Sequence, residues 1–283
     1  MNNAPVGILD SDIGGLSVVN EFRRLCPSED ILYFADTAHY PYGTKTTEEI
    51  FRCFKDSSDF LIQRGVKAIL CACSTASAVA LPTDNSNSQS GNSKLQGFQN
   101  EFRIPVIGML NRELVDTTLS VSKKHKTIGL IATQLTVKSK AFEKLFQMEV
   151  PNVFYFHSQI ATELVNAVTE GNFSQNKITP LLNDVFKTFP LSQLGALIIG
   201  CTHFYHLREQ IRDYIFPIPL IEPSKVASLC LKQKLEEGQQ TQVPTHIGKI
   251  QCFVSGDKTA FEKRVRVLEK NQGVGYVNTF HQC

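Results

Sequence analysis

The sequence predicts an α/β fold of two similar lobes, each a mainly parallel sheet flanked by helices, with a cleft between them. Short, wholly apolar runs alternate along the 283 residues with segments of helical periodicity, a pattern typical of parallel strands covered on both faces. The chain also carries a weak internal repeat, because residues 6–11 (VGILDS) are echoed by 128–133 (IGLIAT), and 67–75 by 195–202. Chance likeness between apolar strands is the alternative explanation of the repeat.

The first half of the chain begins with three predicted strands, each an apolar run bounded by polar or turn residues. These strands are expected at residues 6–9, 31–34 and 68–71. Helices are expected at 16–25 and 47–64, the second because Ile50, Phe54 and Leu61 follow one helical face. Residues 82–97 are rich in Asn, Ser and Gln, which predicts a solvated, mobile loop.

The second half repeats this alternation and adds a C-terminal extension. Its apolar runs predict strands at residues 105–107, 128–131, 153–156, 196–199, 219–221 and 249–254. Its helical segments are expected at residues 138–147, 160–170, 177–186, 225–237 and 259–268. The run at 105–107 is grouped with the strands that follow it.

Composition excludes several classes of protein. The formal net charge is only +2, and no lysine or arginine run resembles a nucleic-acid footprint. The N-terminus lacks the basic and apolar segments of a secretory signal. No apolar run approaches the roughly 18 residues that span a bilayer. We therefore expect a cytoplasmic protein that binds neither nucleic acid nor membranes.

The eight cysteines do not indicate a disulfide framework or a zinc site. Disulfide frameworks belong to small secreted domains, and the chain has no CxxC pair to hold zinc. Most of the cysteines are expected to be small buried apolar residues.

Polar clusters follow four of the predicted strands, at the strand ends where open parallel sheets bind ligands. They are Asp10-Ser11, Asp36, Cys73-Ser74-Thr75 and Cys201-Thr202-His203. Each cluster lies about where a helix begins, and backbone N–H groups at a helix N-terminus favour a substrate carboxylate or a thiolate.

Cys73 and Cys201 are the candidate acid and base. Inverting a stereocentre requires proton removal on one face and proton donation on the other, which two thiols on facing lobes can perform. The alternative for either cysteine is a small buried filler. His203 could set the protonation of Cys201, and Asp10 could do so for Cys73. Asp10 could equally be the N-cap of the following helix, which does not exclude the first role, and Asp12 could be that cap instead.

Two glycine-containing segments carry weaker signals. Gly14-Gly15 lacks the glycine spacing of the dinucleotide fingerprint and the Walker pattern, so nucleotide binding is not expected. Residues 41–43 (PYG) are a turn signal by composition.

Taken together, these segments resemble the glutamate racemase family, within the aspartate/glutamate racemase superfamily. The similar segments occur in the family's order and span most of the chain; they are 7–11 with 14–16, Asp36 with 41–43, 72–76, Thr136-Val137 with Ser139, and 200–203.

The resemblance implies an active site between the lobes, no pyridoxal phosphate or metal, and Cys73 and Cys201 as the acid/base thiols assisted by Asp10 and His203. It implies a substrate-binding set of Asp10, Ser11, Tyr42, Gly43, Ser74, Thr75, Thr202 and His203. It also implies a first lobe of residues 1–98 plus 208–283 and a second lobe of 99–207. D-Glutamate supply for peptidoglycan and a homodimer follow by analogy.

The chain departs from the family pattern at several positions. Asp12 stands where the family usually has Gly, Ser74 where it has Asn, and Thr169 where it has a glutamate. A Glu-Pro pair usual after residues 106–107 is replaced near Asn111-Arg112. Three alternatives therefore compete: an aspartate, broad-specificity or hydantoin racemase; a racemase-like protein that only binds; and a periplasmic-type binding protein, which the missing export signal disfavours.

Overall fold

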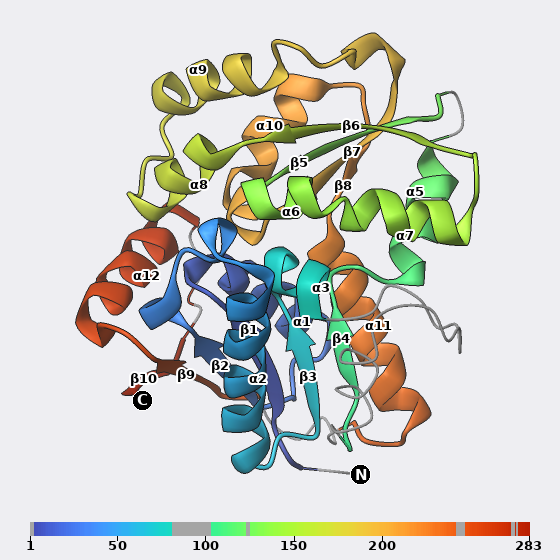
Figure 1. The fold of residues 1–283 in the computed structure, drawn as a ribbon. Coiled ribbons are helices and arrows are strands. Elements are labelled where there is room, and N and C mark those ends of the chain that lie inside the picture. Colours follow the sequence, from blue (N-terminus) through green and yellow to red (C-terminus); the bar gives the residue numbers. More distant parts are fainter. Residues whose placement is uncertain (1–2, 81–102, 123–124, 242–246, 273–274, 276) are drawn as a thin grey trace.

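The computed structural model describes residues 3–80, 103–122, 125–241, 247–272, 275 and 277–283, and shows two parallel sheets flanked by helices (Figure 1). The first sheet has the strand order β10-β9-β2-β1-β3-β4 and the second has the order β6-β5-β7-β8. The two-lobed α/β prediction is confirmed. The loop predicted at 82–97 lies outside the described residues.

The strands lie close to the predicted apolar runs. The first sheet contains β1 (Val6–Asp10), β2 (Ile31–Ala35), β3 (Ala68–Cys71), β4 (Val106–Gly108), β9 (Ile250–Val254) and β10 (Thr279–Gln282). The second contains β5 (Thr127–Ala132), β6 (Tyr155–Ile160), β7 (Leu194–Gly200) and β8 (Leu220–Ile221). All residues of β1, β2, β3 and β7 are buried, because helices cover both faces of each sheet.

Helices connect successive strands. The α-helices are α1 (Leu16–Leu25), α2 (Thr47–Gln63), α3 (Ser74–Ala80), α5 (Arg112–Val121), α6 (Gln134–Ser139), α7 (Ala141–Glu149), α8 (Thr162–Thr169), α9 (Gln175–Phe186), α10 (Arg208–Ile215), α11 (Pro223–Glu237) and α12 (Lys258–Gln272). Short 3-10 helices are η1 (Ile13–Gly15), η2 (Thr37–His39), η3 (Tyr42–Thr44), η4 (Leu191–Gln193) and η5 (Thr202–Leu207).

The internal repeat corresponds to a repeated topology. In the first sheet β1 pairs with β2 and β3, and β3 pairs with β4; in the second, β5 pairs with β6 and β7, and β7 pairs with β8. The strands that echo each other in sequence, β1 with β5 and β3 with β7, therefore occupy equivalent positions. Equivalent strands end in equivalent places, so the polar residues that follow them are equivalent too.

The predicted lobe limits do not coincide with the sheets. Those limits place β4 in the second lobe and β8 in the first, whereas β4 pairs with β3 and β8 pairs with β7. Both strands are short apolar runs, and apolar periodicity reveals burial but not which sheet a strand joins. We propose that the chain crosses between lobes near 109–111 and near 222.

The helix predicted over 138–147 is two helices. Lys140 has φ +53 and separates α6 from α7, because a left-handed residue cannot continue a right-handed helix. The strand β10 and the helices α5 and α10 had no counterpart among the predicted elements.

Helix α2 begins with a capping box. Thr46 accepts a hydrogen bond from the Glu49 backbone N–H, and the Glu49 side chain accepts one from the Thr46 backbone, so two otherwise unsatisfied donors are paired. Within the described ranges, no helix has the length and apolar character needed to cross a membrane.

Candidate active site

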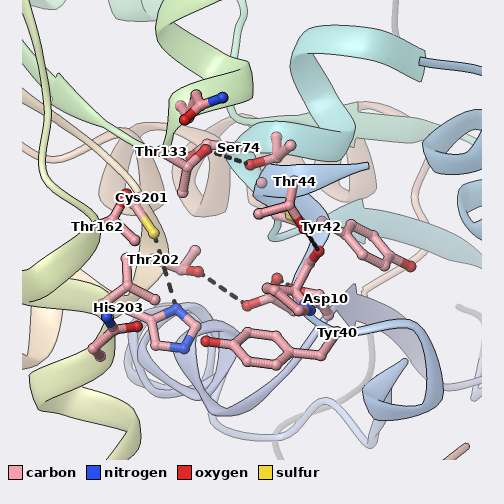
Figure 2. A pocket seen from close by; sticks show the side chains of 18 residues that line it. Asp10, Tyr40, Tyr42, Thr44, Ser74, Thr133, Thr162, Cys201, Thr202 and His203 are labelled. Carbon is pink, nitrogen blue, oxygen red and sulfur yellow. Dashed lines mark hydrogen bonds between the residues drawn. The ribbon is translucent and has the colours of Figure 1, made fainter. Parts of the chain in front are cut away.

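A cavity of about 200 Å³ lies between the two lobes, at the C-terminal ends of their central strands (Figure 2). Residues at the end of β1 and just after β1 and β3 line it from the first lobe, and residues just after β5 and β7 line it from the second. All ten residues predicted for the site line this cavity: Asp10, Ser11, Tyr42, Gly43, Cys73, Ser74, Thr75, Cys201, Thr202 and His203. The carboxyl ends of parallel strands meet at one edge, which brings these distant segments together.

Eight further residues line the cavity and were not predicted. They are Tyr40, Pro41, Thr44, Thr133, Gln134, Thr162, Val165 and Asn166. The repeat contained a signal for one of them, because Thr133 is the counterpart of Ser11. The residues on α8 follow β6, a half-exposed strand whose predicted apolar run (153–156) ends before the strand does, and no sequence signal marked them.

Cys73 lies immediately before α3 and is buried. Its sulfur accepts a hydrogen bond from the backbone N–H of Ala76 at 3.5 Å, as expected for a thiol at a helix N-terminus. Burial, followed by the negative charge of Asp10, nevertheless raises the pKa of Cys73 well above its usual range. The raised pKa favours the protonated thiol of Cys73 over its thiolate.

Asp10 connects the two lobes. Its carboxylate accepts hydrogen bonds from the Ser11 backbone N–H at 2.7 Å and from the Thr202 hydroxyl at 3.0 Å. Burial raises the pKa of Asp10 despite the nearby His203 and these hydrogen bonds. The Asp10 side chain is thus bound to the site and not to the backbone of α1, whose N-cap is Gly15.

Cys201 lies at the end of β7, directly before the 3-10 helix η5, which also carries His203. The Cys201 sulfur is 3.9 Å from Nδ1 of His203, and Figure 2 shows the two side chains side by side. Burial opposes a charge on His203, but the nearby Asp12 carboxylate and Cys201 sulfur raise the pKa of His203 well above its usual range. A cationic imidazole stabilises a neighbouring thiolate.

Asp36 stands behind the cavity and supports its wall. It accepts a hydrogen bond from the Tyr42 hydroxyl at 2.6 Å and one from the Ser255 hydroxyl at 2.8 Å, and it contacts His39. The Tyr42 hydroxyl is therefore committed to Asp36, so a substrate would meet the ring or backbone of Tyr42.

Gly14 and Gly15 are explained by close packing. A Cβ on Gly14 would lie 2.5 Å from Oγ1 of Thr202 and 2.6 Å from Nδ1 of His203. A Cβ on Gly15 would lie 2.6 Å from the Cβ of Asp10. The glycine pair allows η1 to pack against the segments that carry the site residues.

Threonine hydroxyls join the lobes on the other side of the cavity. Oγ1 of Thr75 lies 3.0 Å from Oγ1 of Thr133 and 3.2 Å from Oγ1 of Thr136, and the last two are 3.0 Å apart. Gly43 faces this triangle, with Thr133 only 3.1 Å from the position of an added Cβ. The hydroxyls offer donors for a carboxylate at the lobe interface.

One group of side chains in the described part of the chain has the spacing of a metal site. The ligand atoms of Asp36, His39 and Cys53 lie within 4.8 Å of one another. The Asp36 carboxylate already accepts the hydrogen bonds described above, and burial, followed by the charge of Asp36, raises the pKa of Cys53 to about 11. A metal would have to displace these contacts and deprotonate the thiol.

Comparison with known proteins gives a consistent family. The Asp/Glu/Hydantoin racemase family model matches residues 14–229. Glutamate racemase of Limosilactobacillus reuteri is 32% identical over 225 residues, covering 79% of this chain and 78% of that protein. Glutamate racemase of Clostridium botulinum is 30% identical over 274 residues, covering 95% of this chain and 98% of that protein.

Solved structures agree with this result. Glutamate racemase of Thermus thermophilus, in complex with beta-chloro-D-alanine, has a TM-score of 0.81 and 28% identity over 100% of this chain and 98% of that chain. Glutamate racemase of Francisella tularensis, in complex with D-glutamate, has a TM-score of 0.81 and 29% identity, also over 100% of this chain and 98% of that chain.

Proposed function

The chain belongs to the Asp/Glu/Hydantoin racemase family and is an isomerase, and from this premise we propose that it interconverts L- and D-glutamate without a cofactor. In this proposal Cys73 and Cys201 are the acid and base. One observation carries it: two thiols that follow equivalent strands of the two lobes line the same cavity.

The chemistry requires two groups on opposite faces of the substrate. A thiolate on one side takes the Cα proton, so that an S–H bond forms as the C–H bond breaks. The thiol on the other side then gives its proton to the opposite face of Cα and becomes a thiolate. The enzyme ends with the protonation of its cysteines exchanged, ready for the reverse reaction.

The cavity must also stabilise the negative charge that develops when the Cα proton leaves. The hydroxyls of Ser11 and Thr75, together with backbone N–H groups at the starts of α3 and η5, are the donors we assign to the α-carboxylate. The Thr202 hydroxyl donates to Asp10 and positions that carboxylate instead. Burial strengthens these contacts because the local dielectric is low.

Glutamate is proposed as the substrate because the relatives and the structural neighbours described above are glutamate racemases. The eighteen described residues that line the cavity include no lysine or arginine. We assign the side-chain carboxylate of the substrate to neutral donors of the second lobe, among them Gln134, Thr162 and Asn166.

Proton NMR in deuterated water tests the reaction. The purified protein, with reduced thiols and no added cofactor, is expected to exchange the α-proton of L-glutamate and to form D-glutamate, which chiral chromatography detects. L-Aspartate, L-alanine and L-serine run in parallel. Exchange with another amino acid alone would move the proposal to a sister racemase, and a folded sample that exchanges none would refute it.

Cysteine variants test the mechanism. Cys73→Ser and Cys201→Ser should each abolish racemisation and leave the fold intact. Cys26→Ser is the matched control, because Cys26 is buried at the end of α1 and does not line the cavity. Full activity in either site variant would remove that cysteine from the mechanism.

A peptidoglycan role and a homodimer are part of the same proposal. Growth of a bacterium that requires supplied D-glutamate should become independent of the supplement when it expresses this chain. Light scattering should report twice the chain mass of 31.6 kDa. Continued dependence on the supplement would contradict the peptidoglycan role, and a monomeric mass under assay conditions would contradict the homodimer.

A further inference from the structure

We propose that Asp12 is a positioning residue for the half-reaction at Cys201: anchored by Arg264, its buried carboxylate fixes the His203 ring beside the thiol. The proposal deepens the proposed function and rests on it. It concerns a residue outside the predicted site, at the position where the resemblance marks a departure from the family pattern.

Asp12 is fully buried between the two lobes. It follows β1 and precedes η1, and its backbone carbonyl accepts a hydrogen bond from the Tyr33 hydroxyl. Its Oδ1 accepts a hydrogen bond from Nη2 of Arg264 at 2.6 Å, across 252 positions of sequence. The side chain at the N-cap position of η1 is therefore held by α12 and does not serve as a cap.

The second carboxylate oxygen of Asp12 faces the catalytic candidate His203. Oδ2 of Asp12 lies 3.9 Å from Nε2 of His203. Both atoms are buried, and within the described residues neither has a hydrogen-bond partner. Two buried polar atoms that face each other without other partners are costly, and a closure of about 1 Å would satisfy both. Catalytic hydrogen bonds are often long before substrate binds.

The His203 ring thus lies between the Cys201 thiol and the Asp12 carboxylate. Nδ1 lies 3.9 Å from the Cys201 sulfur, and Nε2 faces Asp12. The partner of one imidazole nitrogen determines which proton the other carries. With the Nε2 proton donated to Asp12, Nδ1 faces Cys201. In the neutral ring Nδ1 can accept the thiol proton, and in the imidazolium it donates its proton to the thiolate and stabilises it.

Charge supports the same assignment. His203 contacts or faces titratable and charged groups from every element packed against it: Asp10, Asp12, Tyr40, Cys201, His206 and, through Asp12, Arg264. Burial opposes the imidazolium, and the nearby Asp12 carboxylate is the first of the effects that raise the pKa of His203. Asp12 also separates His203 from the Arg264 guanidinium, which would otherwise repel it.

The decisive experiment follows His203 itself by NMR titration of the imidazole in the full-length protein, with the signal assigned by its loss in His203→Gln. Asp12→Asn keeps the shape of the side chain and removes its charge. Because an opposite charge within about 4–6 Å typically shifts a pKa by about 1–3 units, His203 should titrate at least about one unit lower. The kcat/KM should fall about tenfold or more, with the basic limb of its pH profile moving the same way.

Arg264→Gln provides the opposite perturbation. It removes a cation and leaves the Asp12 charge in place, so the His203 pKa should rise while kcat/KM falls because the clamp is lost. The Arg264 side chain is 29% exposed, so its replacement disturbs the core less than a change at the buried Asp12. Arg264→Gln therefore tests the proposal even if Asp12→Asn does not fold. Arg266→Gln, on the exposed face of the same helix, is the control and should change neither quantity.

The outcomes separate this proposal from the proposed function. An unchanged His203 titration in Asp12→Asn, or shifts of the same sign in both variants, overturns the role of Asp12 even if the protein racemises glutamate. Opposite shifts in a protein that exchanges no amino acid would support the clamp and reject the proposed activity. Racemisation with opposite shifts supports both.

Discussion

Substituting Gly14 by alanine should damage the site although it replaces no residue proposed to act in it. The added Cβ would lie 2.5 Å from Oγ1 of Thr202, 2.6 Å from Nδ1 of His203 and 2.9 Å from its backbone nitrogen. Ordinary contact begins near 3.4 Å, so the His203 ring and the start of η5 must retreat by about 0.5–0.8 Å. Backbone on both sides of the contact prevents a simple side-chain rotation.

The expected loss of activity follows from how small a displacement of catalytic groups an enzyme tolerates. Productive arrangements hold to within about 0.5 Å, and a misplacement of about 1 Å can cost about 100-fold. We therefore expect kcat/KM for glutamate to fall by about 10- to 100-fold. Because L- and D-glutamate are equal in free energy, the fall in kcat/KM must be the same in both directions. Overpacking should also lower the free energy of unfolding by about 1–3 kcal/mol.

Chiral chromatography gives the initial rates from each enantiomer and thus the change in kcat/KM. Urea unfolding of the same samples gives the change in the free energy of unfolding. Gly238→Ala is the matched control: an added Cβ there comes no nearer than 3.4 Å to any atom, and the nearest belongs to the flexible Gln240 side chain. The control should keep the rates of the unaltered protein. Activity within about twofold in Gly14→Ala, from a folded sample, would refute the view that this packing positions Thr202 and His203.

Three further predictions address other parts of the site. Tyr42→Phe should lower the free energy of unfolding by about 1.5–3 kcal/mol, because Asp36 loses a buried donor at 2.6 Å. The KM of the variant should stay within about threefold of the unaltered value. A larger increase of KM in steady-state assays would mean that the Tyr42 hydroxyl contacts the substrate. Thr75→Val removes a hydroxyl that lies 3.0 Å from Thr133 and is assigned to the substrate carboxylate, so kcat/KM should fall about tenfold or more; unchanged kinetics would contradict that assignment. Burial lowers the pKa of His206 to about 3, so below about pH 6.5 the unfolded chain binds a proton that the folded chain does not, and the free energy of unfolding falls as pH falls. Between about pH 7 and about pH 5, the free energy of unfolding of His206→Gln, measured in urea, should therefore fall by about 2 kcal/mol less than that of the unaltered protein. Equal decreases in the two proteins would exclude a neutral buried His206.

Local pattern was sufficient for most of the fold. Apolar runs marked the strands because a strand buried on both faces must be apolar throughout, and β1, β2, β3 and β7 are fully buried. The repeat was visible because equivalent strands face equivalent surroundings. Sheet membership had no local signal, which is why the expected lobe limits separate β4 and β8 from the sheets that they join.

The candidate site was readable for a related reason. Asp10, Cys73 and Cys201 each follow a buried strand directly, and parallel strands end at a common edge. Their convergence on one cavity thus follows from topology, while their roles stay predictions until the variants are measured. Tyr40 and the α8 residues enter the cavity from segments whose sequence does not distinguish them from ordinary loop and helix surface.

The class of fold, the repeated lobes and the pair of thiols follow from residues that are adjacent in the chain, so they could be predicted without coordinates. What each side chain faces depends on how distant segments pack. The Asp12 carboxylate meets Arg264 from α12 and His203 from η5, and the Tyr42 hydroxyl meets Asp36. Such contacts join residues that are far apart in sequence or turn a side chain away from the substrate, and short-range periodicity contains no information about either.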